Sequence, residues 1–328
     1  MINKSLKILP LLLVASLTAC TNLKHIEGAG YYFYTEVSYS LYAKYVDPEE
    51  SIQEICKTLD SVSDPYENRI LTTNVYDLNQ TNKEIRIREE LYNLLEAAKS
   101  ASEKAANFNP LIGSLSEKWK ATLGKDNPEP LSKTIIDDEL AKIATSSYVT
   151  RKANDKYYAQ RNGEALLDLG AITKGYALDR IYECLNKSGV TDYIINAGSS
   201  SILLGKNEHA TSKVDYYTVG LRDVPGVTFK AKECVISSSG NDVQGVKIGN
   251  TMYSHIINPN TGSAIMDNDA VIVITDRSTG YLGDALSTSM MMNSVEEIKE
   301  IEKAVNAKTI VVKNKQIIYS HPDIEFVS

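Results

Sequence analysis

The sequence predicts an α+β protein that forms one compact domain, with a helix-rich N-terminal half and a sheet-rich C-terminal half around one site. Residues 88–107 are rich in Ala, Leu, Glu and Lys, with apolar residues at helical spacing. Between residues 216 and 312, short runs of β-branched residues indicate strands instead. No segment rich in Gly, Pro or Ser is long enough to separate two independent domains.

In the N-terminal half, one strand is expected first, because apolar and small polar residues alternate through residues 30–42. Proline and acidic residues then open a helix at residue 48. The predicted helices cover residues 48–59, 88–107, 111–123 and 137–144. In the C-terminal half, strands are expected at residues 216–222, 235–238, 252–257, 270–275 and 309–312, and a helix at residues 282–292.

Residues 167–180 are the stretch around which the rest of the chain is organised. Residues 165–169 have the pattern of a short buried strand, and a glycine turn follows. Beyond Gly175, apolar residues at one helical face predict a helix that stops at residues 188–189. A second strand at residues 193–197 would complete a βαβ-like unit with a right-handed crossover.

The start of this helix has the features of an anion site. Unpaired N–H groups and the helix dipole favour a negative ligand there, and Lys174 adds a full positive charge in the first turn. The alternative is that Gly170 and Gly175 only permit a tight turn and that Lys174 is solvated. The spacing fits neither of the two common glycine-rich phosphate loops.

Asp284 and Thr288 suggest a metal site on the helix at residues 282–292. Residues four apart share one helical face, and carboxylate and hydroxyl oxygens suit Mg²⁺ or Ca²⁺. Alternatively, Asp284 is a helix cap and Thr288 bonds back to a carbonyl. An anion site together with a hard-metal pair is what phosphate ester chemistry requires.

The N-terminus has the basic, apolar and small-residue regions of a secretion signal. Residues 17–20 resemble a bacterial lipobox, in which Cys20 is acylated. We therefore expect a signal peptide at residues 1–19, a tether at residues 20–30, a domain at residues 31–328 and a lipid anchor on the extracytoplasmic face of the cell membrane.

A formal charge of −7 without a Lys/Arg-rich run argues against nucleic acid as a partner. The other cysteines form no disulfide framework in the sequence pattern.

Four segments in the same order resemble the signatures of the ApbE family of FAD:protein FMN transferases. Residues 168–179 (DLGAITKGYALD) are similar to its DLGGIAKGYAVD signature, and residues 196–198 (NAG) to its NAGG. Residues 255–262 (HIINPNTG) resemble its HIIDPRTG, and residues 283–288 (GDALST) its ADALSTA. Weaker similarity extends the resemblance over nearly the whole mature chain.

The resemblance implies an enzyme that splits the pyrophosphate of FAD with Mg²⁺ and moves FMN onto a Thr or Ser hydroxyl of an extracytoplasmic acceptor protein, releasing AMP. It implies that Mg²⁺ is held by Ala171, Asp284, Ser287 and Thr288, and that His255 accepts the proton of the acceptor hydroxyl. The residues expected to contact FAD are Phe33, Asn107, Phe108, Asn109, Asp168, Lys174, Ser239 and Ile257.

The chain departs from the family signatures at Ser199, Asn258 and Asn109. Ser199 replaces a glycine and is expected to add bulk near the ligand, and the two asparagines replace aspartates. These departures bear on FAD affinity and metal binding more than on the class of reaction. Two alternatives to the transferase are a Mg²⁺-dependent FAD pyrophosphatase, with water as the nucleophile, and a lipid-anchored FAD-binding protein without catalysis.

Overall fold

The computed structural model describes residues 23–44, 46–67, 72–209, 214–241 and 245–327. The expected signal peptide and the lipidation of Cys20 lie outside these residues. Within them, no helix is both long and apolar enough to span a bilayer.

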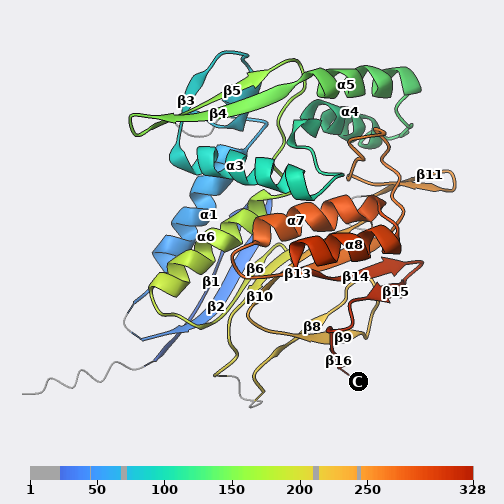
Figure 1. The fold of residues 1–328 in the computed structure, drawn as a ribbon. Coiled ribbons are helices and arrows are strands. Elements are labelled where there is room, and N and C mark those ends of the chain that lie inside the picture. Colours follow the sequence, from blue (N-terminus) through green and yellow to red (C-terminus); the bar gives the residue numbers. More distant parts are fainter. Residues whose placement is uncertain (1–22, 45, 68–71, 210–213, 242–244, 328) are drawn as a thin grey trace, which may run out of the picture.

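An eight-stranded sheet forms the centre of the molecule, and each strand pairs antiparallel with its neighbours (Figure 1). In spatial order the strands are β1 (Lys24–Tyr32), β2 (Thr35–Ala43), β6 (Asp192–Ala197), β7 (Ser201–Leu204), β10 (Cys234–Gly240), β13 (Ala270–Thr275), β14 (Lys308–Lys313) and β15 (Gln316–Ser320).

Helices cover one face of this sheet, and a small second sheet covers the other (Figure 1). The helical layer contains α1 (Glu49–Ser63), α3 (Glu89–Lys104), α6 (Thr173–Lys187), α7 (Gly280–Ser289) with the 3₁₀ turn η2 (Met290–Met292), and α8 (Val295–Val305). The second sheet contains β8 (Tyr217–Gly220), β9 (Thr228–Ala231) and β16 (Phe326–Val327). Because successive strand residues face opposite sides, Val235 packs toward the helices while Ile236 joins the core below.

The remaining elements lie above the helical layer or at its edge (Figure 1). They are α2 (Val75–Asn79), η1 (Pro110–Ile112), α4 (Gly113–Leu123), α5 (Lys133–Thr145), the sheet of β3 (Ile85–Ile87), β5 (Lys156–Asn162) and β4 (Ser147–Ala153), and the hairpin of β11 (Val246–Ile248) and β12 (Thr251–Tyr253).

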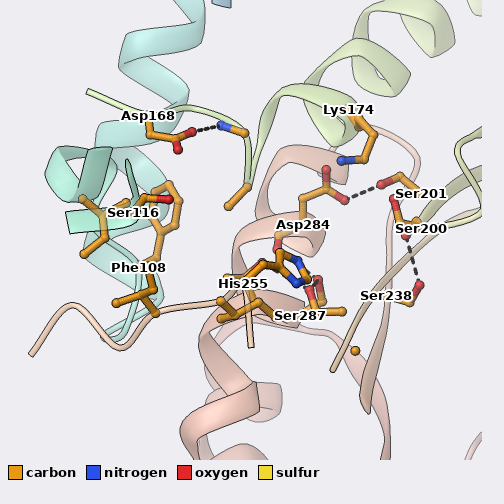
Figure 2. A pocket seen from close by; sticks show the side chains of 18 of the residues that line it. Phe108, Ser116, Asp168, Lys174, Ser200, Ser201, Ser238, His255, Asp284 and Ser287 are labelled. Atoms are coloured by element: carbon orange, nitrogen blue, oxygen red, sulfur yellow. Dashed lines mark hydrogen bonds between the residues drawn. The ribbon is translucent and has the colours of Figure 1, made fainter. Parts of the chain in front are cut away.

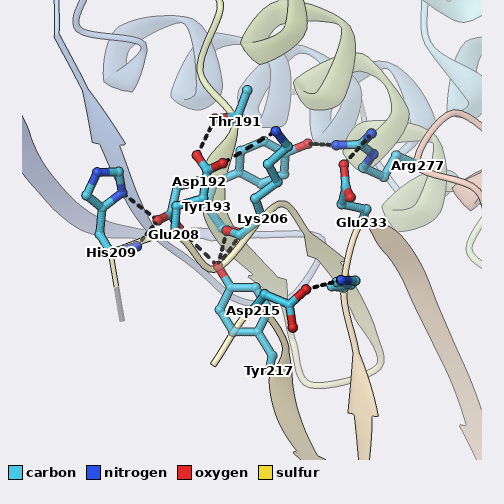
Figure 3. Close-up of polar contacts among 11 residues, drawn as sticks. Thr191, Asp192, Tyr193, Lys206, Glu208, His209, Asp215, Tyr217, Glu233 and Arg277 are labelled. Carbon is cyan, nitrogen blue, oxygen red and sulfur yellow. Dashed lines mark hydrogen bonds and ion pairs between the residues drawn. The ribbon is translucent and has the colours of Figure 1, made fainter. Parts of the chain in front are cut away.

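A polar network joins the second sheet to the start of β6 (Figure 3). The buried Asp192 carboxylate accepts a 2.7 Å hydrogen bond from the main-chain N–H of His209. The same carboxylate lies 2.7 Å from Nδ1 of the His209 ring. The Tyr217 hydroxyl, from β8, lies 3.3 Å from the same carboxylate and 3.0 Å from the Lys206 carbonyl. This network holds the second sheet against the main one.

The prediction of a single strand at residues 30–42 is wrong, because the chain turns back at Phe33 and Tyr34 and forms the hairpin of β1 and β2. The expected tether is corrected as well, since β1 already begins at Lys24. Both turn residues have positive φ, 53° and 58°, which is strained for bulky side chains. Asp60 on α1 accepts a 2.6 Å hydrogen bond from the Phe33 N–H and so supports the turn.

The expected βαβ-like unit is absent. Residues 165–169 have no regular secondary structure and pair with no strand, and β6 runs antiparallel to both of its neighbours. Helix α6 itself is confirmed, and so are the strand at β6 and the helix at α7.

Helices α6 and α7 cross at two glycines. Gly175 and Gly280 face each other so closely that an added Cβ on either would overlap the carbonyl group of the other. One turn further along α6, the buried Asp179 carboxylate accepts hydrogen bonds from the N–H groups of Gly280 (2.5 Å) and Tyr281 (3.0 Å). Asp179 therefore caps the N-terminus of α7 and fixes the two helices relative to each other.

We expect Gly175→Ala to lower the free energy of unfolding by about 1–3 kcal/mol, because the methyl group must push α7 away. Gly220→Ala is the control. No atom lies within 4 Å of its added Cβ, so the change should stay below about 1 kcal/mol. Urea unfolding followed by circular dichroism measures both, and equal effects would contradict the close crossing.

Candidate functional site

A cavity of about 440 Å³ opens where the helical layer meets the ends of the central strands (Figure 2). Every residue that the sequence assigns to the site lines this one cavity: Phe33, Asn107, Phe108, Asn109, Asp168, Ala171, Lys174, Ser239, His255, Ile257, Asp284, Ser287 and Thr288. These residues come from segments between positions 33 and 288, so the fold brings together what the chain separates.

The glycine turn forms one wall of the cavity. The Asp168 carboxylate accepts a 2.8 Å hydrogen bond from the Gly170 N–H, which orders the turn before α6 begins at Thr173 (Figure 2). Lys174 therefore lies in the first turn of the helix. It lines the same cavity as His255 and Asp284, and its ammonium acts to lower the pKa of both groups (Figure 2).

Asp284 connects three elements to α7. Its Oδ1 accepts hydrogen bonds from the hydroxyls of Ser201 on β7 (2.8 Å) and Ser237 on β10 (2.7 Å), and its Oδ2 accepts one from the Gly175 N–H on α6 (2.6 Å). Burial raises the pKa of the Asp284 carboxyl, while Lys174 and these donors oppose that effect. The alternative that Asp284 caps a helix is wrong, because α7 begins four residues earlier at Gly280.

Hydroxyl groups continue this polar wall one helical turn further. The Ser239 hydroxyl lies 3.0 Å from that of Ser287 and 3.2 Å from that of Thr288. Two residues along a strand and four along a helix both advance about 6–7 Å. Ser237 on β10 therefore lies beside Asp284 on α7, and Ser239 lies beside Thr288.

The donor set fits a hard cation. Asp284 Oδ2 has a lone pair left after the Gly175 bond, and the hydroxyls of Ser287 and Thr288 add neutral oxygens beside it. The main chain at Ala171 lines the same cavity. In the described ranges no three His, Cys, Asp or Glu side chains gather as a metal-binding group.

His255 presents a neutral imidazole to the cavity. Burial, with help from the Lys120 and Lys174 ammonium groups, lowers its pKa to about 4. Its Nδ1 is buried and has no hydrogen-bond partner. Near neutral pH the ring is therefore unprotonated, and this nitrogen can bind a ligand or accept a hydrogen bond from one.

The structure shows what Asn107, Asn109 and Asn258 do in their loops, and it places Ser199 outside the cavity. Asn107 bonds to Asn260 (2.8 Å), Asn109 accepts from the Leu111 N–H (2.9 Å), and Asn258 accepts from the Asn260 N–H (2.8 Å), so all three amides order loops. Ser199 is exposed and does not line the cavity, which corrects the expected bulk near the ligand. Its φ of 60° explains why glycine suits this position.

The sequence interpretation missed several cavity residues, above all Lys120 and Arg222. Burial alone would lower the pKa of Lys120, but Asp168 and the Tyr66 hydroxyl raise it above its usual value. The helical spacing from Ser116 to Lys120 could have revealed Lys120, because both face the cavity from α4. Nothing in the local sequence indicates Arg222.

Comparison with known proteins gives consistent matches. Residues 33–311 match the family model described as ApbE family. A protein of Treponema pallidum (strain Nichols) named FAD:protein FMN transferase is 26% identical over 226 residues, which cover 64% of this chain and 62% of that protein. One of the same name from Klebsiella pneumoniae (strain 342) is 28% identical over 254 residues, covering 73% and 74%.

The chain thus spans less than two thirds of the Treponema relative. Among solved structures, the ApbE protein of Thermotoga maritima superposes with a TM-score of 0.72 at 22% identity, over 92% of this chain and 96% of that one. The predicted α+β fold is therefore confirmed as the fold of that protein.

We expect the ring of His255 to titrate near pH 4 in an NMR experiment on the free protein. Because the pKa lies below its ordinary 6.5, the folded state binds fewer protons than the unfolded state. The stability from this residue is therefore complete above pH 6.5 and declines as the pH falls toward 4. Lys174→Met should move the titration upward, and a midpoint near 6.5 in the unmodified protein would contradict the burial.

Proposed function

The chain belongs to the ApbE family, and on this basis we propose that it is an FAD:protein FMN transferase acting on a Thr or Ser hydroxyl of an acceptor protein. The observation that carries the proposal is the meeting of His255, Lys174 and the Asp284, Ser287 and Thr288 oxygens in one cavity. Transfer of a phosphoryl-linked group from a diphosphate requires three kinds of group: a neutral base, a cation that binds phosphate and oxygen donors for a hard metal ion.

The cavity has two chemically different parts, which suits a flavin dinucleotide. Phe33, Phe108 and Ile257 provide apolar surface for a flavin ring. Lys174, Asp284 and the serine hydroxyls lie together on the other side, where charged phosphates would be stabilised (Figure 2).

Asp284, Ser287, Thr288 and the Ala171 carbonyl would hold Mg²⁺, which neutralises phosphate charge when it is bound. The Lys174 ammonium would stabilise the same phosphates from the adjoining first turn of α6, where the Thr173 and Gly175 N–H groups already donate to the Leu169 carbonyl and to Asp284. Asp179 keeps the two walls in register by tying α7 to α6.

In the transfer, the acceptor hydroxyl oxygen forms a bond to the phosphorus of the FMN part, and the bond from that phosphorus to the AMP oxygen breaks. The hydroxyl proton passes to the neutral imidazole of His255, and AMP leaves with the bonding electron pair. The low pKa of His255 keeps the ring unprotonated before this step.

We further propose that the protein acts on the extracytoplasmic face of the cell membrane, anchored through Cys20. The support is the lipobox-like sequence at residues 17–20. Because β1 begins at Lys24, few residues separate the expected anchor from the sheet.

The direct test incubates the protein with FAD, Mg²⁺ and an acceptor that carries a D-x-x-[ST]-G-[AS]-T segment. We expect the acceptor to gain the mass of FMN and AMP to appear in equal amount, with EDTA abolishing both. Free FMN and AMP without acceptor would instead favour the pyrophosphatase. Retention of FAD without AMP would favour a binding protein.

Thr288→Val should lower transfer at limiting Mg²⁺ by about tenfold or more, with partial recovery at high Mg²⁺, because one oxygen donor is lost. Ser289→Ala is the matched control. This neighbouring hydroxyl bonds to the Leu286 carbonyl at 3.3 Å and does not line the cavity. Equal Mg²⁺ dependence in the two variants would contradict the donor set.

We also propose that Lys120, a cation in the cavity lining, helps to hold the anionic part of FAD. Lys120→Met should then raise the Kd for FAD by about tenfold or more, while riboflavin binding stays unchanged. Lys118→Met is the control, since Lys118 lies on the same helix but pairs with Glu139 at 3.5 Å outside the cavity lining. Fluorescence titration measures both ligands, and an equal loss of riboflavin binding would contradict a phosphate contact.

A further inference from the structure

Residues 165–169, which lead into the glycine turn, pair with no strand and are held by main-chain bonds at two positions and by side chains at others. Their main-chain groups make two hydrogen bonds to the starts of α4 and η1, from Gly113 N–H to the Leu166 carbonyl (2.9 Å) and from Asp168 N–H to the Pro110 carbonyl (2.8 Å). Buried backbone groups need partners, and the groups of Leu167 find theirs elsewhere.

Asn79, the last residue of α2, binds both main-chain groups of Leu167. Its Oδ1 accepts from the Leu167 N–H at 2.8 Å, and its Nδ2 donates to the Leu167 carbonyl at 2.9 Å. The side chain is buried, with 7% of the residue exposed. One amide thus makes the pair of bonds that a residue of an adjacent strand would make.

Arg161 supports this arrangement from β5. Its guanidinium donates to the Asn79 carbonyl at 3.2 Å and to the Ala165 carbonyl at 3.2 Å, and it also bonds to the Gly163 carbonyl. Only 6% of Arg161 is exposed. The end of α2 is therefore joined to residues 165–169 at two places: directly at Leu167, and through Arg161 at Ala165.

The residue after Leu167 is Asp168, whose carboxylate orders the turn through the Gly170 N–H. Ala171 and Lys174 follow within six residues and line the cavity with Asp168. A displacement of Leu167 would therefore also displace Asp168, the glycine turn and the start of α6, which bonds to Asp284 through the Gly175 N–H.

We propose that Asn79 is a positioning residue for the cavity: by fixing Leu167 it sets the position of Asp168 and of the glycine turn against the substrate. The inference rests on the proposed transferase function for its kinetic consequence. Its structural part, the ordering of the turn by Asn79, is independent of that function.

Asn79→Ala is the test variant, and Asn74→Ala is its matched control. Asn74 is also a fully buried asparagine of α2, at the N-cap, and it donates to the Glu67 carbonyl at 2.8 Å. None of its bonds reaches residues 163–171, and it does not line the cavity. Both variants lose buried hydrogen bonds, so a comparable fall in Tm is expected for both.

The first readout is amide hydrogen exchange in the absence of ligand. We expect Asn79→Ala to speed exchange at Leu167 and Gly170 by about tenfold or more, and Asn74→Ala to leave both amides unchanged. Unchanged exchange at Gly170 in Asn79→Ala overturns the proposal, whether or not the protein is a transferase.

The second readout is FMN transfer, measured well below the Tm of both variants. We expect Asn79→Ala to lower kcat/KM for FAD by about tenfold or more, and Asn74→Ala to stay within about threefold of the unmodified protein. In an Asp168→Ala background, Asn79→Ala should add less than about twofold, because its effect passes through Asp168. Full additivity, or equal losses in both asparagine variants, overturns the positioning role. Absence of transfer in the unmodified protein refutes the proposed function alone, and the exchange result still decides the structural part.

Discussion

The cavity depends on one buried carboxylate. Asp284 reaches from α7 to α6, β7 and β10, and its two oxygens accept one hydrogen bond from each of these three elements. A buried charge without such donors would be strongly unfavourable. The three donors stabilise this carboxyl group, and their bonds to it fix the N-terminus of α6, the start of β7 and the middle of β10 relative to α7.

Local patterns in the sequence predicted much of this arrangement. The 3.6-residue periodicity after Gly175 predicted α6, and the four-residue spacing of Asp284 and Thr288 predicted that both face the same cavity. The anion turn and the oxygen pair also met as expected. Helix α6 and the shared face of Asp284 and Thr288 depend on residues close together in the chain, so spacing could reveal them, whereas the meeting of the turn with the oxygen pair was expected from phosphate chemistry and from the family resemblance.

Long-range contacts explain what the sequence did not predict. The segment at residues 165–169 has the composition of a strand, but its partner is Asn79, 88 positions from Leu167. The turn at Phe33 and Tyr34 has none of the usual turn residues, so a hairpin looked like one strand. Arg222 reaches the cavity from the end of the second sheet, which no local pattern could indicate.

The hairpin between β1 and β2 has a further consequence. Left-handed backbone at a residue with a Cβ costs about 1–2 kcal/mol, and the chain accepts this at two successive aromatic residues that line the cavity. Glycine at either place would make the hairpin easier to fold but would remove a ring from the rim. The two aromatic rings in the cavity lining therefore come with a lower stability of the folded protein. Selection for heat-resistant variants would favour replacing them.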